Sequence, residues 1–311
     1  MNLVHKIAKV VTGPDPLKRT ILAINKSPLR FLVRRCVNLF HMKQRGLRVR
    51  HAQGLKTDAR LEERVHAVRD RGYTMLDQEL DSKLGTELLE YTWAKVQKSP
   101  LLGRDQEGQP KDFWVRLSDD DLKESSLSSN HVLVRYALQE SILKIVASYF
   151  GEVPCLTYVL LTLSQHTDEP LKISQLWHSD RDDVKILKLF TYLSDVTDVE
   201  SGPLTLFDRP TSRRINLGFF MRHTPDESVR RQAGGAAQVQ IKGPKMTSFV
   251  VDTGVCHHMG SRMAPGHMRL MFTALYTSFP SMYPGSKTLQ VSLDGPLTPL
   301  QRMVLQTPGA V

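Results

Sequence analysis

The most informative spacing in this sequence joins a histidine and an aspartate two positions apart, His178 and Asp180, in the stretch WHSD. Residues i and i+2 of a strand point to the same face, so these two side chains can reach one point. Imidazole and carboxylate together suit Fe(II), and a second imidazole from a distant strand would complete a facial triad with open coordination positions. The pattern therefore predicts a metal site that needs one more histidine.

A His-x-Asp pair is weak evidence alone, because about one such pair is expected by chance in a chain with eleven histidines. The stretch QHTDEP contains another, His166 and Asp168. Its polar neighbours and Pro170 favour a turn, whereas KISQLW before His178 has the apolar alternation of a strand. We therefore favour His178 and Asp180 as the metal ligands.

The stretch DTGVCHHMGSRMAPGHMR offers the second imidazole, because it places His257 beside His258. Neighbouring strand residues point to opposite faces, so one of the two faces inward, and the residues alone leave both open. Arg269 follows His258 at eleven positions. A guanidinium binds a carboxylate through two hydrogen bonds, and the apolar neighbours of Arg269 argue against a surface arginine at a strand start.

The elements that must position these residues change character at Gly151. Before it, three stretches have helical apolar spacing, namely ARLEERVHAVRDRG, LDSKLGTELLEYTWAKVQKS and NHVLVRYALQESILKIVASYFG, and each predicts one helix. After it come short β-rich stretches: LTYVLLTLSQ, KISQLWHSD, KILKLFTYLSDV, GPLTLFD, AAQVQIKG, TSFVVDTG and RLMFTALYTSF. Helices followed by strands predict a mainly β fold, a sandwich or jelly roll with flanking helices.

Charge divides the chain at its N-terminal end. Residues 1–57 carry thirteen Lys/Arg and one acid, a net +12 against +10 for the whole chain, which leaves −2 for the rest. The stretch LKRTILAINKSPLRFLVRRCVNLFHMKQRGLRVRH interleaves these cations with apolar residues, so it predicts a basic amphipathic helix that contacts an anionic membrane or nucleic acid. The alternative is a helical extension packed on the domain with its arginines in water.

We expect residues 1–58 to form this extension and residues 59–311 to form one domain, with helices over 59–150 and a jelly-roll core over about 151–280. An insertion at about 209–245 carries eight Lys/Arg and two acids, which predicts a basic lid that favours an anionic substrate. The three cysteines form no CxxC, and no run of eighteen apolar residues occurs. These features predict a protein of a reducing compartment, the cytoplasm.

Several of these stretches together resemble one family. QLWHSDRDDVKILKLFTYLSDVTDVESGPLTLF, VVDTGVCHHMGSR and HMRLMFTALY are similar to the phytanoyl-CoA dioxygenase family of Fe(II)/2-oxoglutarate oxygenases, and the resemblance covers about residues 60 to 280. It implies a double-stranded β-helix, the cupin-like form of the jelly roll. It also implies Fe(II) as cofactor, with 2-oxoglutarate and O₂ as co-substrates.

The resemblance also implies roles for single residues. The family's distal histidine precedes a short xGS turn, which selects His258 and turns His257 to the other side of the strand. Arg269 falls where the family's arginine binds the distal carboxylate of 2-oxoglutarate. Asp180 stands where related halogenases have a small residue, so hydroxylation is the implied reaction.

The strand ILKLFTYL supplies further candidates for the co-substrate pocket. Lys188 interrupts an apolar run, so its ammonium would contact co-substrate or substrate, or reach outward to solvent. Phe190 and Thr191 lie in the same strand, and we expect both to line the pocket. The stretch FDRPTSRR departs from the turn that the family often has after its Gly-Pro strand, so substrate contacts there do not carry over.

The sequence thus predicts a dioxygenase that hydroxylates an anionic small molecule, lipid or glycan-related substrate and releases succinate and CO₂. We also predict a peripheral membrane contact through residues 1–57, and we expect no nucleic-acid partner. The alternative is a non-catalytic jelly-roll module that acts through its basic N-terminus on a membrane or nucleic acid. A third hypothesis is a cupin-type enzyme that uses the metal without 2-oxoglutarate.

Overall fold

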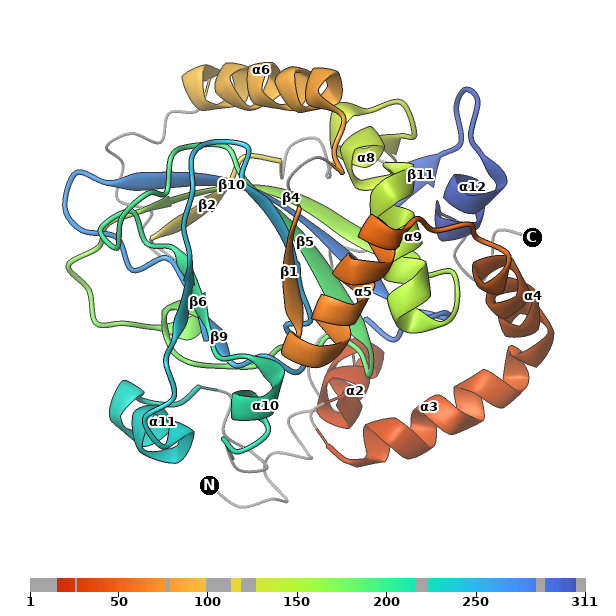
Figure 1. Cartoon of the computed structure of the whole chain (residues 1–311), viewed down its shortest axis with the longest axis horizontal. Coiled ribbons are helices and arrows are strands. Elements are labelled where there is room, and N and C mark those ends of the chain that lie inside the picture. Colours follow the sequence, from red (N-terminus) through yellow and green to blue (C-terminus); the bar gives the residue numbers. More distant parts are fainter. Residues whose placement is uncertain are drawn as a thin grey trace.

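Two antiparallel sheets face each other, and helices cover the outer side of the larger one (Figure 1). The computed structural model describes residues 16–25, 27–76, 79–98, 113–118, 127–215, 223–283 and 289–305. The large sheet has the order β1 (Tyr73–Leu76), β8 (Ser248–Val251), β5 (Ile186–Tyr192), β10 (Met268–Thr277), β4 (Cys155–Gln165) and β2 (Trp114–Arg116). The small sheet has the order β7 (Val239–Ile241), β6 (Leu204–Leu206) and β9 (His258–Met259), and β11 (Val291–Ser292) pairs with β3 (Leu127–Ser128).

The two faces of the large sheet differ because strand side chains alternate. In β5, Leu187 and Leu189 join the core under the helices, whereas Phe190 packs with residues of the small sheet. In β10, Leu270 joins the helix-side core and Met271 the inner one. The inner face also carries polar groups, so the space between the sheets is where chemistry can occur.

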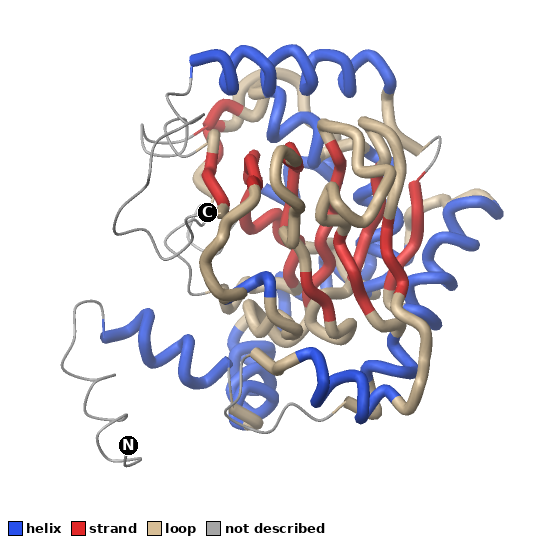
Figure 2. The backbone as a smooth tube through the Cα atoms, turned by 90° about the vertical axis from the view of Figure 1, so that its left-hand side faces the viewer, coloured by secondary structure: helices blue, strands red, loops and turns tan. Residues whose placement is uncertain are grey.

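Helices cover the opposite face of the large sheet, and Figure 2 shows most of them behind the strands and one along the top. They are α5 (Ala59–Arg71), α6 (Ser82–Lys98), α8 (Val132–Ala137), α9 (Glu140–Phe150), with α12 (Pro299–Leu305) beside α9. Asp58 caps α5 by accepting from the Leu61 amide at 2.8 Å, and Gly72 ends it in the left-handed conformation. The predicted fold class, a jelly roll with flanking helices, is confirmed.

The third predicted helix is in fact two, because the chain breaks at Leu138–Gln139. Side chains bind the carbonyls that a continuous helix would use. The carbonyl of Tyr136 accepts from Gln139, that of Ala137 from Tyr276, and that of Leu138 from Gln301. These bonds satisfy carbonyls at the C-terminal end of α8. The apolar spacing continues across the break, so the sequence pattern did not reveal it.

The stretch KISQLWHSD is not the predicted strand. Ile173–Gln175 forms a 3₁₀ turn in which Ile173 has φ of 51°. Trp177 and His178 then make single antiparallel bridges, to Thr224 and His258. The prediction was wrong because apolar alternation also fits a turn followed by isolated bridges. The shared orientation of the ligands therefore has another origin, described below.

The N-terminal helices are α2 (Pro16–Asn25), α3 (Leu29–Phe40) and α4 (Met42–Gln53). Two of their arginines are buried rather than in water. Arg48 donates to the carbonyls of Val153 and Pro154 at 3.0 Å, and Arg34 donates to residues 278–280. The extension forms three helices rather than one, and these two side chains attach it to the domain. No described helix has the length and apolar character needed to span a bilayer.

The basic insertion is only partly a loop. It contains α10 (Arg209–Ser212), α11 (Asp226–Ala233) and strand β7 of the small sheet. Arg262 holds α11 through two hydrogen bonds of 2.6 and 2.7 Å to Asp226. Residues 216–222 of the predicted lid lie outside the described residues, so the lid stays a prediction.

Gly72 offers a test of this packing. An alanine there would have φ near 86°, and its Cβ would overlap the sulfur of Cys256. Gly151 is the matched control, since it ends α9 with φ of 72° and has no atom within 4 Å of an added Cβ. We expect Gly151→Ala to cost about 1 kcal/mol of unfolding free energy and Gly72→Ala about 2 kcal/mol or more. Equal losses in denaturant unfolding would contradict the close contact with Cys256.

Candidate metal centre

His178, Asp180 and His258 meet at one point, where one potential ligand atom of each lies within 4.8 Å of the others. Their backbones set this arrangement. The amide of each histidine donates to the carbonyl of the other, at 3.0 and 2.9 Å, and the amide of Asp180 donates to the carbonyl of Thr253 at 2.8 Å. The segment 178–180 is thus paired with the distal loop, which aims all three side chains inward.

Both imidazoles have a fixed orientation. Nδ1 of His178 lies 2.8 Å from the carbonyl of Leu176, and Nδ1 of His258 lies 2.9 Å from the carbonyl of Cys256. A carbonyl can only accept, so each Nδ1 carries the proton and each Nε2 presents a lone pair. The Nε2 atoms lie 3.8 and 3.7 Å from the carboxylate oxygens of Asp180. A hydrogen bond at the far nitrogen is how metal-binding histidines are commonly held.

The charge states suit a cation. Burial lowers the pKa of His178 to about 3, with a further contribution from His258, and burial also lowers the pKa of His258. Burial opposes the charge of Asp180, but Lys188 and the two histidines hold its pKa below the usual range. Two neutral imidazoles and one carboxylate are the forms in which these groups bind metal, so no proton has to leave near neutral pH.

Lys188 lies on the inner face of β5 and contacts the candidate ligand. Its Nζ is 2.6 Å from Oδ2 of Asp180 and 3.3 Å from Oδ2 of Asp182. The side chain is buried, so the outward orientation considered from the sequence does not occur. The ammonium orients Asp180, and its predicted contact with co-substrate stays a prediction.

Phe190 and Thr191 occupy opposite faces of β5. Phe190 stacks on Phe249 between the sheets, with ring centroids 5.4 Å apart. The hydroxyl of Thr191 instead lies 2.8 Å from that of Ser248 and 3.2 Å from that of Tyr136, on the helix-covered face. The expectation that both line the pocket does not hold for Thr191, because consecutive strand residues alternate.

Arg269 lies on the inner face of β10 and is only 2% exposed. Its guanidinium donates to the hydroxyl of Ser261 at 2.8 Å and to the carbonyl of Gly202, and its Nε has no hydrogen-bond partner within the described chain. No described carboxylate pairs with it, and burial lowers its pKa. A buried cation held by neutral groups alone is costly, so the position of Arg269 favours an anionic partner.

Two hydroxyls beside Arg269 escaped the sequence analysis. Ser261 lies three residues after His258, and its Oγ is 3.2 Å from Oγ of Ser164, which is paired with Arg269 in the β4–β10 register. The three side chains form a polar patch between the sheets. The GSR turn was the available signal for Ser261, but Ser164 had none, because its position depends on the strand register.

His257 turns away from the cluster. Its amide donates to the hydroxyl of Ser212 at 2.9 Å, and its buried Nδ1 has no partner among the described residues. Burial lowers its pKa to about 4. A histidine that the sequence did not single out, His223, lies beside a ligand, with its ring centroid 5.6 Å from that of His178.

A buried polar network shapes the loop before His258. Oδ1 of Asp252 accepts from the amides of Gly254 and Val255 at 3.1 and 3.2 Å. Its Oδ2 accepts from the Tyr149 hydroxyl and from Arg209. The network ties helices α9 and α10 to the distal loop. Sequence analysis missed Asp252, although the DTG triplet is typical of an Asx turn.

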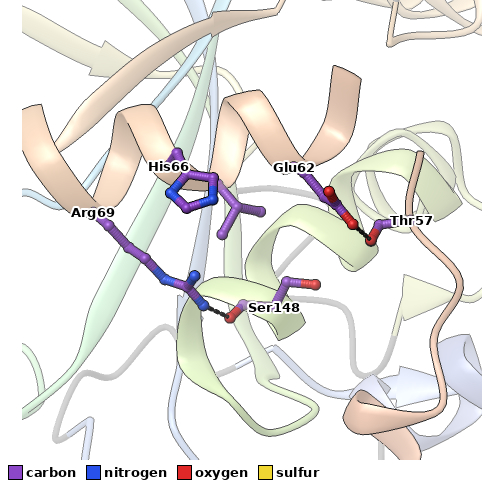
Figure 3. Close-up of a pocket in the computed structure, with 6 residues that line it drawn as sticks. Thr57, Glu62, His66, Arg69 and Ser148 are labelled. Atoms are coloured by element: carbon purple, nitrogen blue, oxygen red, sulfur yellow. Dashed lines mark hydrogen bonds between the residues drawn. The ribbon is translucent and has the colours of Figure 1, made fainter. Parts of the chain in front are cut away.

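Other candidate sites are weaker. His166 and Asp168 form a pair 3.0 Å apart in the turn after β4, where the carboxylate is fully exposed, and no third ligand joins them among the described residues. A hollow of about 230 Å³ between α5 and α9 is lined by Thr57, Glu62, Val65, His66, Arg69 and Ser148 (Figure 3). Thr57 donates to Glu62 and Arg69 donates to the Ser148 carbonyl, so these two side chains are already engaged within the protein.

Comparison of the structure with solved ones identifies several proteins of the same architecture. EctD from S. alaskensis with bound Fe has a TM-score of 0.51 at 14% identity, and the match covers 76% of this chain and 88% of that one. EctD with 2-oxoglutarate and 5-hydroxyectoine gives 0.51 at 12% identity and the same coverage. The non-heme alpha ketoglutarate dependent carbocyclase SnoK gives 0.50 at 16% identity, over 79% of this chain and 96% of that one.

The chain has the fold of the Fe(II)/2-oxoglutarate oxygenases. The double-stranded β-helix implied by the sequence resemblance is therefore confirmed as a fold. No family profile and no curated protein matches the sequence. Assignment to the phytanoyl-CoA dioxygenase family remains a proposal.

The paired histidines give a direct test of the cluster. His258→Ala removes a ligand atom, whereas His257→Ala removes a buried neighbour that faces away. In titrations with Co(II), a redox-stable probe, we expect His258→Ala to weaken binding by at least about 100-fold and His257→Ala to leave it within about tenfold. Circular dichroism would establish that both variants are folded. An equal loss in the two variants would contradict the cluster.

Proposed function

We propose that this protein is an Fe(II)- and 2-oxoglutarate-dependent dioxygenase of the phytanoyl-CoA dioxygenase type, which hydroxylates a small molecule. The observation that carries the proposal is the combination of a His–Asp–His cluster and a buried arginine without an acidic partner within the described chain. Both lie between the sheets of a fold whose solved neighbours include an enzyme with bound Fe and 2-oxoglutarate-dependent enzymes.

His178, Asp180 and His258 would hold the iron through Nε2, a carboxylate oxygen and Nε2. When bound, Fe(II) with 2-oxoglutarate and O₂ supplies the oxidising chemistry that hydroxylates a carbon and releases succinate and CO₂. A facial triad of this kind would leave coordination positions for the co-substrate and O₂. Lys188 keeps Asp180 ionised and oriented.

Arg269 would bind the distal carboxylate of 2-oxoglutarate. A carboxylate there would give the guanidinium a charged partner and satisfy its unpaired Nε. The Ser261 hydroxyl, which already accepts from Arg269, is placed to help orient the same end. Burial between the sheets excludes water, which strengthens the charge pairing.

We further infer an anionic substrate, because the 209–245 insertion carries a net charge of +6. His223, which precedes α11 in this insertion, lies beside His178 and is a candidate substrate contact. All three cysteines are free thiols, and two are buried. This agrees with the proposed cytoplasmic location.

Co-substrate binding tests the role of Arg269. Anaerobic protein loaded with Fe(II) should develop a visible charge-transfer band when 2-oxoglutarate is added. Removing one partner of a buried charge pair costs on the order of 3 kcal/mol, so Arg269→Ala should weaken 2-oxoglutarate binding about 100-fold. Arg302→Ala, at an exposed position of α12, is the control and should bind normally. If the folded, iron-loaded wild type develops no band, 2-oxoglutarate is not its co-substrate. The hypothesis of a cupin-type enzyme that uses the metal without 2-oxoglutarate would then be favoured.

Substrate-independent turnover tests Asp180. We expect Asp180→Ala to abolish the conversion of 2-oxoglutarate to succinate, because two imidazoles alone do not complete the facial triad. Asp182→Ala is the matched variant, since it removes the other carboxylate near Lys188 but no ligand. It should retain turnover, measured as succinate by mass spectrometry. Full activity of Asp180→Ala would exclude the proposed ligand set.

A further inference from the structure

Large apolar side chains are exposed on one short segment. Of the eleven exposed large hydrophobic residues in the described chain, seven fall within residues 29–47. They are Leu29, Phe31, Leu32, Leu39, Phe40, Met42 and Leu47, and their exposed fractions run from 52 to 88%. Scattered single exposures are ordinary, but a cluster of this density indicates an interaction surface.

The orientation of α3 is the reverse of that of a core-facing amphipathic helix. At 100° per residue, its exposed positions cover about half of the helix surface. They are Leu29, Phe31, Leu32, Arg35, Cys36, Leu39 and Phe40. The buried side instead carries Arg34. A core-facing helix normally buries its apolar stripe, so this exposed face is unpartnered within the described structure.

Polar contacts hold α3 in this orientation. Arg34 donates to the carbonyl of Phe279 at 3.0 Å and to the Ser278 hydroxyl, and its Nη1 lies 3.7 Å from Asp183. Rotating the helix to bury its leucines would separate the Arg34 guanidinium from the Asp183 carboxylate. Leaving a buried charge without its partner costs free energy. The apolar face is therefore held outward, along the rim of the molecule between α2 and α4 (Figure 1).

The charge around this face selects the kind of partner. Residues 16–57 contain eleven Lys/Arg and no Asp or Glu. Arg35 lies on the exposed face of α3, and Lys43 follows in α4, also exposed. An apolar centre with cations and no acids matches a bilayer of anionic lipids, where basic residues meet headgroups and apolar ones enter the acyl boundary.

We propose that α3 and the first turn of α4 form a peripheral membrane-binding surface that lies in the interface of an anionic bilayer. Phe31, Leu32, Leu39, Phe40 and Met42 enter the acyl boundary, while Arg35 and Lys43 contact lipid phosphates. This inference goes beyond the proposed oxygenase function and does not depend on it.

The N-terminal helices that carry this surface contact the segment next to the metal centre. Asn25, at the end of α2, donates to the carbonyl of Asp182 at 3.0 Å and to that of Met282 at 2.9 Å. Arg34 approaches the neighbouring Asp183. Both contacts fall within three residues of the candidate ligand Asp180. Membrane binding through α3 would thus hold the catalytic loop at a fixed position relative to the bilayer.

Cys36 makes the proposal directly measurable. It lies on the exposed face of α3, whereas Cys155 and Cys256 are buried, so a thiol-reactive environment-sensitive fluorophore labels one position of the full chain. The labelled protein is titrated with vesicles of phosphatidylcholine alone and of phosphatidylcholine with phosphatidylserine. We expect a blue shift and co-sedimentation only with the phosphatidylserine vesicles, both reduced by high salt.

A paired variant tests the surface itself. Leu32→Ser with Leu39→Ser should weaken vesicle binding of the unlabelled protein by at least about tenfold, because two side chains leave the acyl boundary. Val199→Ser with Leu293→Ser removes two exposed apolar side chains elsewhere and should bind like wild type. Thermal unfolding and the 2-oxoglutarate band should be unchanged in both, which separates this test from that of the proposed function.

Three outcomes would overturn the proposal. One is the absence of binding to anionic vesicles by folded protein. Another is equal binding to phosphatidylcholine, because the cations would then play no part. A third is a concentration-dependent dimer in analytical ultracentrifugation that the Leu32/Leu39 variant dissociates and anionic vesicles do not, since a second copy would then cover the face.

Discussion

Two backbone hydrogen bonds between His178 and His258 determine the rest of the site. They join segments eighty residues apart and place both imidazoles on the same side. The carbonyls two residues before each histidine then fix which nitrogen faces the cluster. A slip of one residue in this pairing would turn His257 inward, so the strands and the Asp252 network have to hold the register. The two sheets thus hold the short backbone pairing between His178 and His258 in register.

Several buried charges lie in or beside the site, and they fall into two groups. Asp180 pairs with Lys188, and Asp252 pairs with Arg209, so these charges are balanced within the protein. Arg269 has only neutral partners among the described residues. Because an unbalanced buried cation is costly, the imbalance locates where an anion belongs. The resemblance to an oxygenase family and the physical cost of burial therefore select the same arginine independently.

The parts of the site that the sequence predicted depend on local patterns. The spacing of His178 and Asp180 and the turn after His258 are readable along the chain, and so are the β-rich stretches of the core. The features that the sequence did not predict depend on contacts between residues that are distant in the sequence. Arg34 and Arg48 are buried because carbonyls of residues 278–280 and 153–154 face them, and those carbonyls are positioned only in the folded chain. The break at Leu138–Gln139 has the same origin.

The structure also changes how the two function hypotheses relate. From the sequence alone, deleting residues 1–57 would distinguish an enzyme from a membrane-binding module, because the deletion would remove membrane binding and spare catalysis. Asn25 and Arg34, however, contact the segment that follows Asp180. Deleting them would leave Asp183 without its guanidinium and free the loop that carries a ligand, so both activities would fall together. Only substitutions on the outward face of α3 separate them, because the side chains of that face are exposed.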